Sequence, residues 1–169
     1  MPRSAPARSL WQQFQLGTAG PRARRYAFRR LHEAAPLERA ALVRQGAPAA
    51  LLVDLADALA IPRERLYQTI GVARATADRK VRADARLDPD ATERALGLAR
   101  LVGQVEQIVR ESGDPDAAPT FDAARWVADF LARPHPALGG RRPGDLMDTA
   151  DGRGVVGDLV AQMQSGAYA

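Results

Sequence analysis

The longest apolar repeat in the sequence lies between residues 89 and 111 and requires an α-helix. Its apolar side chains recur in steps of three and four, at Ala91, Ala95, Leu98, Val102, Val105 and Val109, with Leu101 and Ile108 beside them. Such steps bring all of these side chains onto one helix face. Asp88 followed by Pro89 is a typical helix start, because Asp caps free backbone N–H groups and Pro has none to satisfy. We therefore expect residues 89–111 to form the central helix of the fold.

Shorter helices are expected on both sides of this segment. They cover about 36–46, 48–60, 62–70, 74–83, 121–132 and 152–164, with a short turn of helix at 143–147. Thr120 and Asp151 are the expected N-caps of the two long C-terminal helices. Ala and Leu carry most of the apolar content and aromatic residues make up only 5%, which favours helices over strands. The predicted fold class is all-α.

The chain divides into three parts. Residues 1–35 form a basic arm, residues 36–111 a first helical domain and residues 120–169 a smaller second one, with a linker or loop between the two domains. Trp11, Phe14 and Leu16 are the only anchors in the early part of the arm. For residues 24–33 two interpretations stay open, a basic helix or a mobile, solvated segment.

Charge is distributed unevenly along the chain. Residues 1–44 contain nine arginines and two glutamates, whereas residues 111–169 contain five arginines and nine acidic residues. The basic N-terminal segment suits an anionic partner such as nucleic acid, and the acidic C-terminal segment suits a basic protein or a solvated surface. The sequence has no cysteine, no secretory signal pattern and no apolar run of membrane-spanning length, so we expect a cytoplasmic protein.

Residues 62–70 and 74–83 have the layout of a helix-turn-helix, with Gly71-Val72-Ala73 as the short turn. In that motif the second helix enters the major groove of DNA and contacts phosphates or base edges. The candidate DNA-binding residues are Arg74, Thr76, Arg79, Lys80 and Arg82. Two short helices at a corner, with arginines facing water, would have the same pattern. Asp78 and Asp84 would repel phosphates, unless Asp78 pairs with a neighbouring arginine.

The sequence offers little support for an enzyme. It contains two histidines, His32 and His135, which are far apart along the chain. The aspartates near the C-terminus suggest a metal site, but helix capping and a solvated face explain them more simply. No Gly-rich phosphate loop and no nucleophile elbow is found. We therefore expect no enzymatic activity, no cofactor and no bound metal.

Residues 134–143 (PHPALGGRRP) are too rich in Pro and Gly for regular structure. The glycines remove side-chain bulk and the prolines fix the path, so a partner backbone can approach closely. Leu138 offers an apolar anchor, and Arg141 can make a bidentate contact to a carboxylate. A rigid connector that packs on its own domain is the alternative. In the helix that follows, the apolar side is formed by Val156, Leu159, Val160 and Met163.

A dense series of Pro, Gly and apolar residues runs through the segment 130–169. It comprises Pro134, Pro136, Ala137, Leu138, Gly139, Gly140, Arg141, Pro143, Asp145, Leu146, Thr149, Gly152, Leu159, Gly166 and Tyr168. This pattern closely resembles the toxin-binding domain of the Xre-like antitoxins, the MbcA/ParS/Xre family. Residues 45–110 resemble the helix-turn-helix domain of that family more loosely. Met147 stands where the family often has Leu, a change that conserves volume.

The resemblance implies the antitoxin of a type II toxin–antitoxin system. Its partner would be a RES-domain toxin, which attacks NAD or uses it as an ADP-ribose donor. The antitoxin is expected to form a homodimer, to bind the toxin through its C-terminal domain and to repress its own operon by binding operator DNA. The implied toxin-binding residues are Pro136, Leu138, Gly139, Gly140, Arg141, Pro143, Leu146, Leu159, Met163, Tyr168 and Ala169. The alternative is a stand-alone transcriptional regulator without a toxin partner.

The last residues of the sequence suggest how a toxin is blocked. Tyr168 supplies a flat amphipathic ring, and Ala169 supplies a terminal carboxylate. A pocket built for the anionic, aromatic NAD molecule should contain basic and stacking groups, which such a tail can occupy. We therefore expect residues 167–169 to act as a plug.

Overall fold

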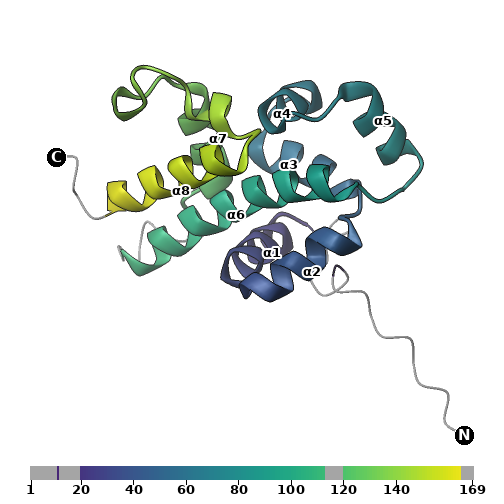
Figure 1. The fold of residues 1–169 in the computed structure, drawn as a ribbon. Helices are drawn as coiled ribbons and strands as arrows, with labels where there is room; N and C mark the ends of the chain where they lie inside the picture. Colours follow the sequence, from purple (N-terminus) through teal and green to yellow (C-terminus); the bar gives the residue numbers. More distant parts are fainter. Residues whose placement is uncertain (1–10, 12–19, 113–119, 165–169) are drawn as a thin grey trace, which may run out of the picture.

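The computed structural model describes residue 11 and residues 20–112 and 120–164, and helices joined by short connections make up these ranges (Figure 1). The helices are α1 (Pro21–Glu33), α2 (Pro36–Gln45), α3 (Ala50–Leu59), α4 (Arg63–Ile70), α5 (Arg74–Arg82), α6 (Pro89–Glu111), α7 (Ala123–Ala132) and α8 (Ala150–Gln164), with 3-10 turns η2 (Pro136–Leu138) and η3 (Pro143–Leu146). Within these ranges the β-structure is limited to an isolated bridge between Pro48 and Arg86. The prediction of an all-α fold is confirmed.

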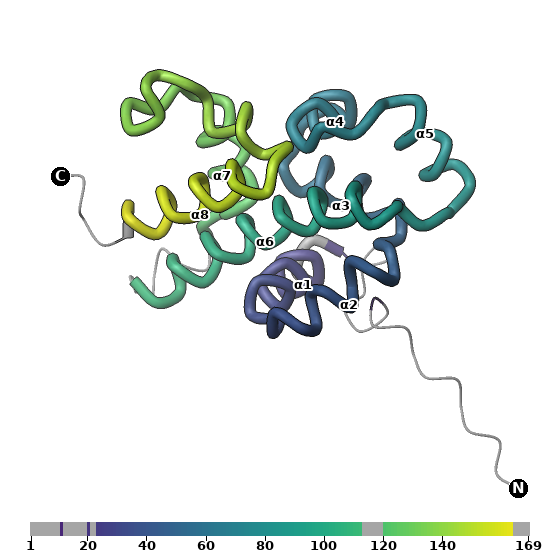
Figure 2. The backbone as a smooth tube through the Cα atoms, in the orientation of Figure 1, coloured from purple at the N-terminus to yellow at the C-terminus, as the bar shows by residue number. Residues whose placement is uncertain are grey.

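Helix α6 lies at the centre of the fold, as its apolar repeat predicts. The tube in Figure 2 shows α1 and α2 on one side of it and α7 and α8 on the other, and all four contact it. Leu98 and Val102 are fully buried in this helix. The Asp88 carboxylate accepts a hydrogen bond of 2.8 Å from the Ala91 backbone N–H, the expected N-cap, and this bond holds the pKa of Asp88 below its usual value.

Helix α1 is an integral part of the core, so the second of the two interpretations of residues 24–33, a mobile segment, is wrong. Its apolar side chains Ala27, Phe28 and Leu31 are buried. It approaches α6 so closely that a Cβ at Gly103 would lie 2.2 Å from the Phe28 carbonyl oxygen. Upstream, the buried Trp11 ring donates a hydrogen bond of 3.1 Å from Nε1 to the Leu42 carbonyl. Phe14 and Leu16 lie outside the described residues.

Two arginines of α1 find buried acidic partners on other helices, which explains how a basic segment packs into a core. Arg24 Nε lies 3.1 Å from Asp54 in α3, and Arg25 Nε lies 2.5 Å from Glu106 in α6. Arg25 also donates to the Phe121 carbonyl at 2.6 Å. Partnered charges of this kind are tolerated where isolated ones are not. The basic character of residues 1–44 is therefore partly neutralised inside the molecule.

Three local expectations in the C-terminal third need correction. Asp122 rather than Thr120 caps α7, since its carboxylate accepts from the Arg125 N–H at 3.0 Å. Asp151 lies in the first turn of α8, and the Thr149 hydroxyl accepts from the Gly152 N–H at 3.1 Å instead. Both helices therefore take a cap two residues away from the expected one, the usual precision of a helix boundary.

The segment 134–143 is also more regular than its composition predicts. Residues 136–138 form the 3-10 turn η2, and the His135 N–H donates to the Arg141 carbonyl at 2.9 Å, which closes the loop. Gly139 and Gly140 make this closure possible because their φ angles are +63° and +80°, values that favour glycine. The Pro and Gly residues thus build a compact hairpin-like turn.

Replacing Gly103 with Ala tests the close packing of α1 on α6. The added methyl group would overlap the Phe28 backbone, so we expect a loss of about 1–3 kcal/mol in the free energy of unfolding. The matched control is Gly154→Ala in α8, where a Cβ meets no atom within 4 Å and the variant should be as stable as the wild type or more so. Thermal and denaturant unfolding measure both. Equal stability of the two variants would contradict the proposed packing.

Candidate functional site

Helices α4 and α5 form the helix-turn-helix that the sequence predicts. Gly71 ends α4 in the left-handed region, with φ +65° and ψ +36°, and the Val72 N–H donates to the Tyr67 carbonyl at 2.9 Å. Ala77 is fully buried and anchors α5 against the core. The opposite face of α5 carries the exposed side chains of Arg74, Arg79 and Arg82, with Thr76 half-buried beside them.

Asp78 is paired, as one reading of the sequence requires. The Arg74 guanidinium lies 3.5 Å from the Asp78 carboxylate and 3.0 Å from Glu64 in α4. The Tyr67 hydroxyl donates to the other Asp78 oxygen at 3.1 Å. Burial of the Tyr67 ring and this hydrogen bond raise the pKa of its hydroxyl. Arg74 and Asp78 thus offset one another, and Arg74 contributes less positive charge to the surface than its exposure suggests.

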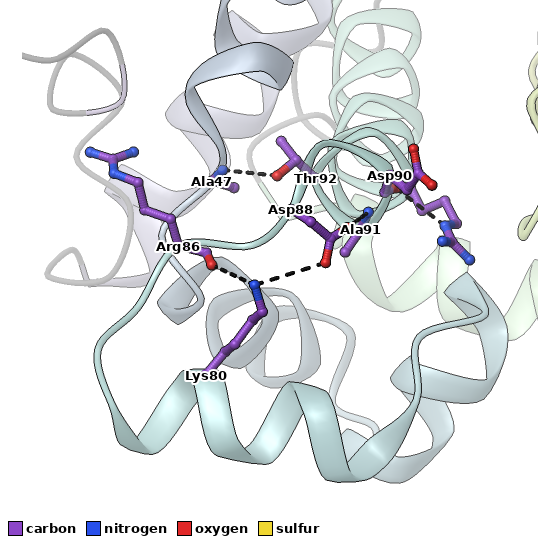
Figure 3. Close-up of polar contacts among 8 residues, drawn as sticks. Ala47, Lys80, Arg86, Asp88, Asp90, Ala91 and Thr92 are labelled. Atoms are coloured by element: carbon purple, nitrogen blue, oxygen red, sulfur yellow. Dashed lines mark hydrogen bonds and ion pairs between the residues drawn. The ribbon is translucent and has the colours of Figure 1, made fainter.

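Lys80 has a role inside the molecule that sequence reasoning missed (Figure 3). Its ammonium group donates to the Arg86 carbonyl at 2.9 Å and lies 3.8 Å from the Asp88 carboxylate. Arg86 in turn donates to the Gly46 carbonyl at 2.6 Å. Lys80 therefore fastens α5 to the connection that leads into α6. In the described part of the chain, Arg79 and Arg82 form no side-chain hydrogen bond or ion pair, which makes them the cations of α5 that are available to a partner.

The C-terminal module exposes some, but not all, of the residues predicted for toxin binding. The exposed members of the predicted set are Pro136, Gly139, Gly140, Arg141 and Met163, with Leu138 and Leu146 half-buried. Pro143 and Leu159 are buried, so they support this surface from below rather than form it. Tyr168 and Ala169 lie outside the described residues.

Val155 of α8 is a further exposed apolar residue, which was not selected from the sequence. Its side chain is 47% exposed, close to the 43% of Met163, which lies eight residues further along α8. A spacing of eight residues places two side chains on one helix face. The sequence contains that spacing, but the apolar side of the helix was predicted from the stronger repeat through Val156 and Val160. Both of these residues are buried.

The helix-turn-helix and the C-terminal module meet at Gly71. Its carbonyl accepts a hydrogen bond of 2.6 Å from Arg94 in α6, and a Cβ on Gly71 would lie 2.9 Å from the Asp148 Cβ between η3 and α8. A groove of about 640 Å³ runs beside this contact, between α3–α4 and α7–η3, with Arg65 and Asp145 on its opposite walls. The turn of the helix-turn-helix therefore abuts the start of the last helix.

Neither a metal cluster nor a membrane span is found in the described ranges. Within them, no three His, Cys, Asp or Glu side chains gather closely enough to hold a metal ion. None of the described helices is both long and apolar enough to cross a bilayer.

The two histidines lie in different parts of the fold. His32 lies in α1, where burial and the nearby Arg100 and Arg39 lower its pKa, while His135 lies in the turn before η2.

Comparison with known proteins supports the same two modules. The antitoxin Xre-like helix-turn-helix domain matches residues 38–100, and the antitoxin Xre/MbcA/ParS C-terminal toxin-binding domain matches residues 116–166. The Prs ADP-ribosylating antitoxin of Sphingobium sp. (strain YBL2) is 39% identical over 144 residues, which cover 85% of this chain and 89% of that protein. With its helix-turn-helix, its toxin-binding module and this similarity over most of its length, the chain belongs to the Xre/MbcA/ParS family of antitoxins.

Proposed function

We propose that this antitoxin binds and inhibits a RES-domain toxin that consumes NAD, and that it represses its own operon by binding DNA. The observation that carries the proposal is the presence of two distinct exposed surfaces on one helical core, the basic face of α5 and the η2–α8 surface. The name of the Sphingobium relative supports the NAD link, since ADP-ribosylation uses NAD as donor. We further propose that the protein acts in the cytoplasm as a homodimer without catalytic activity of its own.

The toxin-docking surface proposed here combines the η2 turn with the outer face of α8. Leu138, Val155 and Met163 supply apolar contact area, and Arg141 supplies a charged group that can pair with a carboxylate. The buried Pro143 and Leu159 act indirectly, because they hold η3 and α8 against the core. Co-expression with a RES-domain toxin, followed by co-purification and measurement of cellular NAD, tests this assignment. An antitoxin that neither co-purifies with that product nor restores NAD would contradict it.

Val155→Asp combined with Met163→Asp should weaken toxin binding at least tenfold. Each change places a charge in an apolar contact that binding would desolvate, while the exposed starting positions leave folding intact. The matched control is Leu37→Asp in α2, whose side chain is 86% exposed on a different helix. Isothermal titration with a catalytically inactive toxin gives the affinities. Equal affinities for the double variant and the control would exclude this face of α8.

Deleting residues 167–169 should separate docking from inhibition. If Tyr168 enters the toxin's NAD pocket, the shortened antitoxin should still form the complex, within about threefold of the wild-type affinity, because the η2–α8 surface is unchanged. It should however fail to protect cells, since the pocket stays open. Pull-down and growth rescue measured in parallel check this. Full growth rescue by the shortened chain would overturn the plug hypothesis but leave the docking surface untouched.

The DNA-binding proposal assigns phosphate contacts to Arg79 and Arg82, with Thr76 beside them, and gives Lys80 a positioning role. Arg79→Ala combined with Arg82→Ala should lower the slope of log affinity against log salt by about two, one per lost phosphate contact. Arg110→Ala, at the far end of α6, is the matched control, because it removes an exposed arginine from a helix outside the motif. Fluorescence anisotropy with the DNA upstream of the gene provides the slopes. An unchanged slope in the double variant would exclude α5 as the helix that contacts DNA phosphates.

Lys80→Met should behave differently from the arginine variants. It removes the hydrogen bond to the Arg86 carbonyl but keeps most of the aliphatic side chain, so we expect a loss of about 0.5–1.5 kcal/mol in the free energy of unfolding. Urea unfolding measures it. A variant that is as stable as the wild type but binds DNA more weakly would instead indicate that Lys80 contacts DNA directly.

A further inference from the structure

A further groove lies apart from both surfaces assigned above. It has a volume of about 700 Å³ and lies along α6, between α1–α2 on one side and α8 on the other. Figures 1 and 2 show how these helices flank α6 from opposite sides. Such a volume falls in the range of small-molecule sites in proteins.

Arg100 of α6 lies in this groove with an unmet hydrogen-bonding capacity. Its side chain is half-buried, and its Nε atom is fully buried without a hydrogen-bond partner among the described residues. A buried donor left without an acceptor costs free energy and is rare in folded proteins. No acidic side chain of the described residues forms an ion pair with Arg100, so its guanidinium can pair with an anion from another molecule.

The charges around Arg100 define what that acceptor should be. The groove is lined by four arginines, Arg39, Arg44, Arg100 and Arg153, against the two carboxylates Glu93 and Asp158. Glu93 is already paired with Arg153 at 3.0 Å. Burial together with the charges of Arg39 and Arg153 lowers the pKa of Arg100, which shows that the cations repel one another. With His32 neutral, the lining has a surplus of two positive charges.

Small residues leave room for more than an ion. Gly97, Gly154 and Gly157 line the groove on the two facing helices. The absence of a Cβ at Gly97 lets the Arg153 side chain cross α6, and a Cβ at Gly154 would meet no atom within 4 Å. Arg153 thus covers the α6 wall at Gly97, and the small-residue surface on which a flat organic group can lie is on α8, at Gly154 and Gly157.

We propose that this groove binds a phosphate-bearing small molecule of nucleotide size, with the phosphate at Arg100 and Arg39. A phosphate monoester carries a charge close to −2 at neutral pH, which matches the surplus of the lining, and its oxygens can accept hydrogen bonds from the part of the Arg100 guanidinium that lines the groove. The guanidinium group is suited to this contact because its planar fork of donors fits phosphate geometry.

The two histidines of the chain provide a built-in reporter and its control. His32 lines the groove and faces Arg39 of α2, Arg100 and Glu111 of α6, and Glu33 of its own helix. A bound phosphate dianion would offset the two arginines and raise the His32 pKa. His135 lies in the turn before η2, outside the groove, and should not respond.

The test is a titration of the full chain, followed by the histidine ring signals in NMR spectra at constant pH and ionic strength. The probes are inorganic phosphate, adenosine monophosphate and adenosine. We expect saturable shifts of His32 with the first two probes, none with adenosine, and none of His135. Tenfold tighter binding of the nucleotide would identify a nucleotide site, and equal binding a site for phosphate alone; both outcomes support the proposal.

Substitutions of two arginines in α6 test whether Arg100 binds the phosphate. Arg100→Gln should weaken binding at least tenfold, whereas Arg110→Gln, which removes the same charge from the same helix outside the groove, should bind like the wild type. If Arg100→Gln does not fold, Arg100→Lys keeps the charge but loses the Nε donor and should also bind more weakly. Shifts of His32 that match those given by sodium chloride, or equal affinities of the Arg100 and Arg110 variants, would overturn the proposal.

Discussion

The contact between the backbones of α1 and α6 at Gly103 is the constraint on which the rest of the fold depends. It brings the most basic helix of the chain against the longest apolar one, at a distance that any side chain on residue 103 would prevent. Once α1 is in place, Arg24 and Arg25 reach their acidic partners on α3 and α6. The other face of α6 is then left for α7 and α8, so one helix carries both halves of the molecule.

This arrangement changes the meaning of the positive charge in the sequence. The excess of arginine in residues 1–44 suggested an arm available to an anionic partner. In the structure, some of these arginines form ion pairs with buried acidic side chains. In α5, Arg74 lies between two carboxylates, and Lys80 donates a hydrogen bond to the Arg86 carbonyl. The basic surface that remains is smaller and more localised, with Arg79 and Arg82 on α5 and a second concentration of arginine in the α6 groove.

Features set by neighbours in sequence could be predicted, and those set by distant contacts could not. The bounds of α6, its Asp88 cap and the Gly71 turn follow from local periodicity and backbone preference. The burial of α1 and the intramolecular role of Lys80 depend on residues brought together by the fold. For the candidate surfaces, the amphipathic pattern predicts the helix α8 itself, but it cannot separate the buried Leu159 from the exposed Val155, since both border the apolar stripe.

Lys80 is the lone lysine of this sequence, and its hydrogen bond to the Arg86 carbonyl places it within the motif assigned to DNA. A lysine-specific protease therefore has a single peptide bond to cut here, after Lys80 in α5. Cleavage of a helical bond requires unfolding around it, so the rate of this one cut reports the openings that expose α5. The protein thus contains its own probe for the dynamics of the recognition helix, readable on a gel as two fragments.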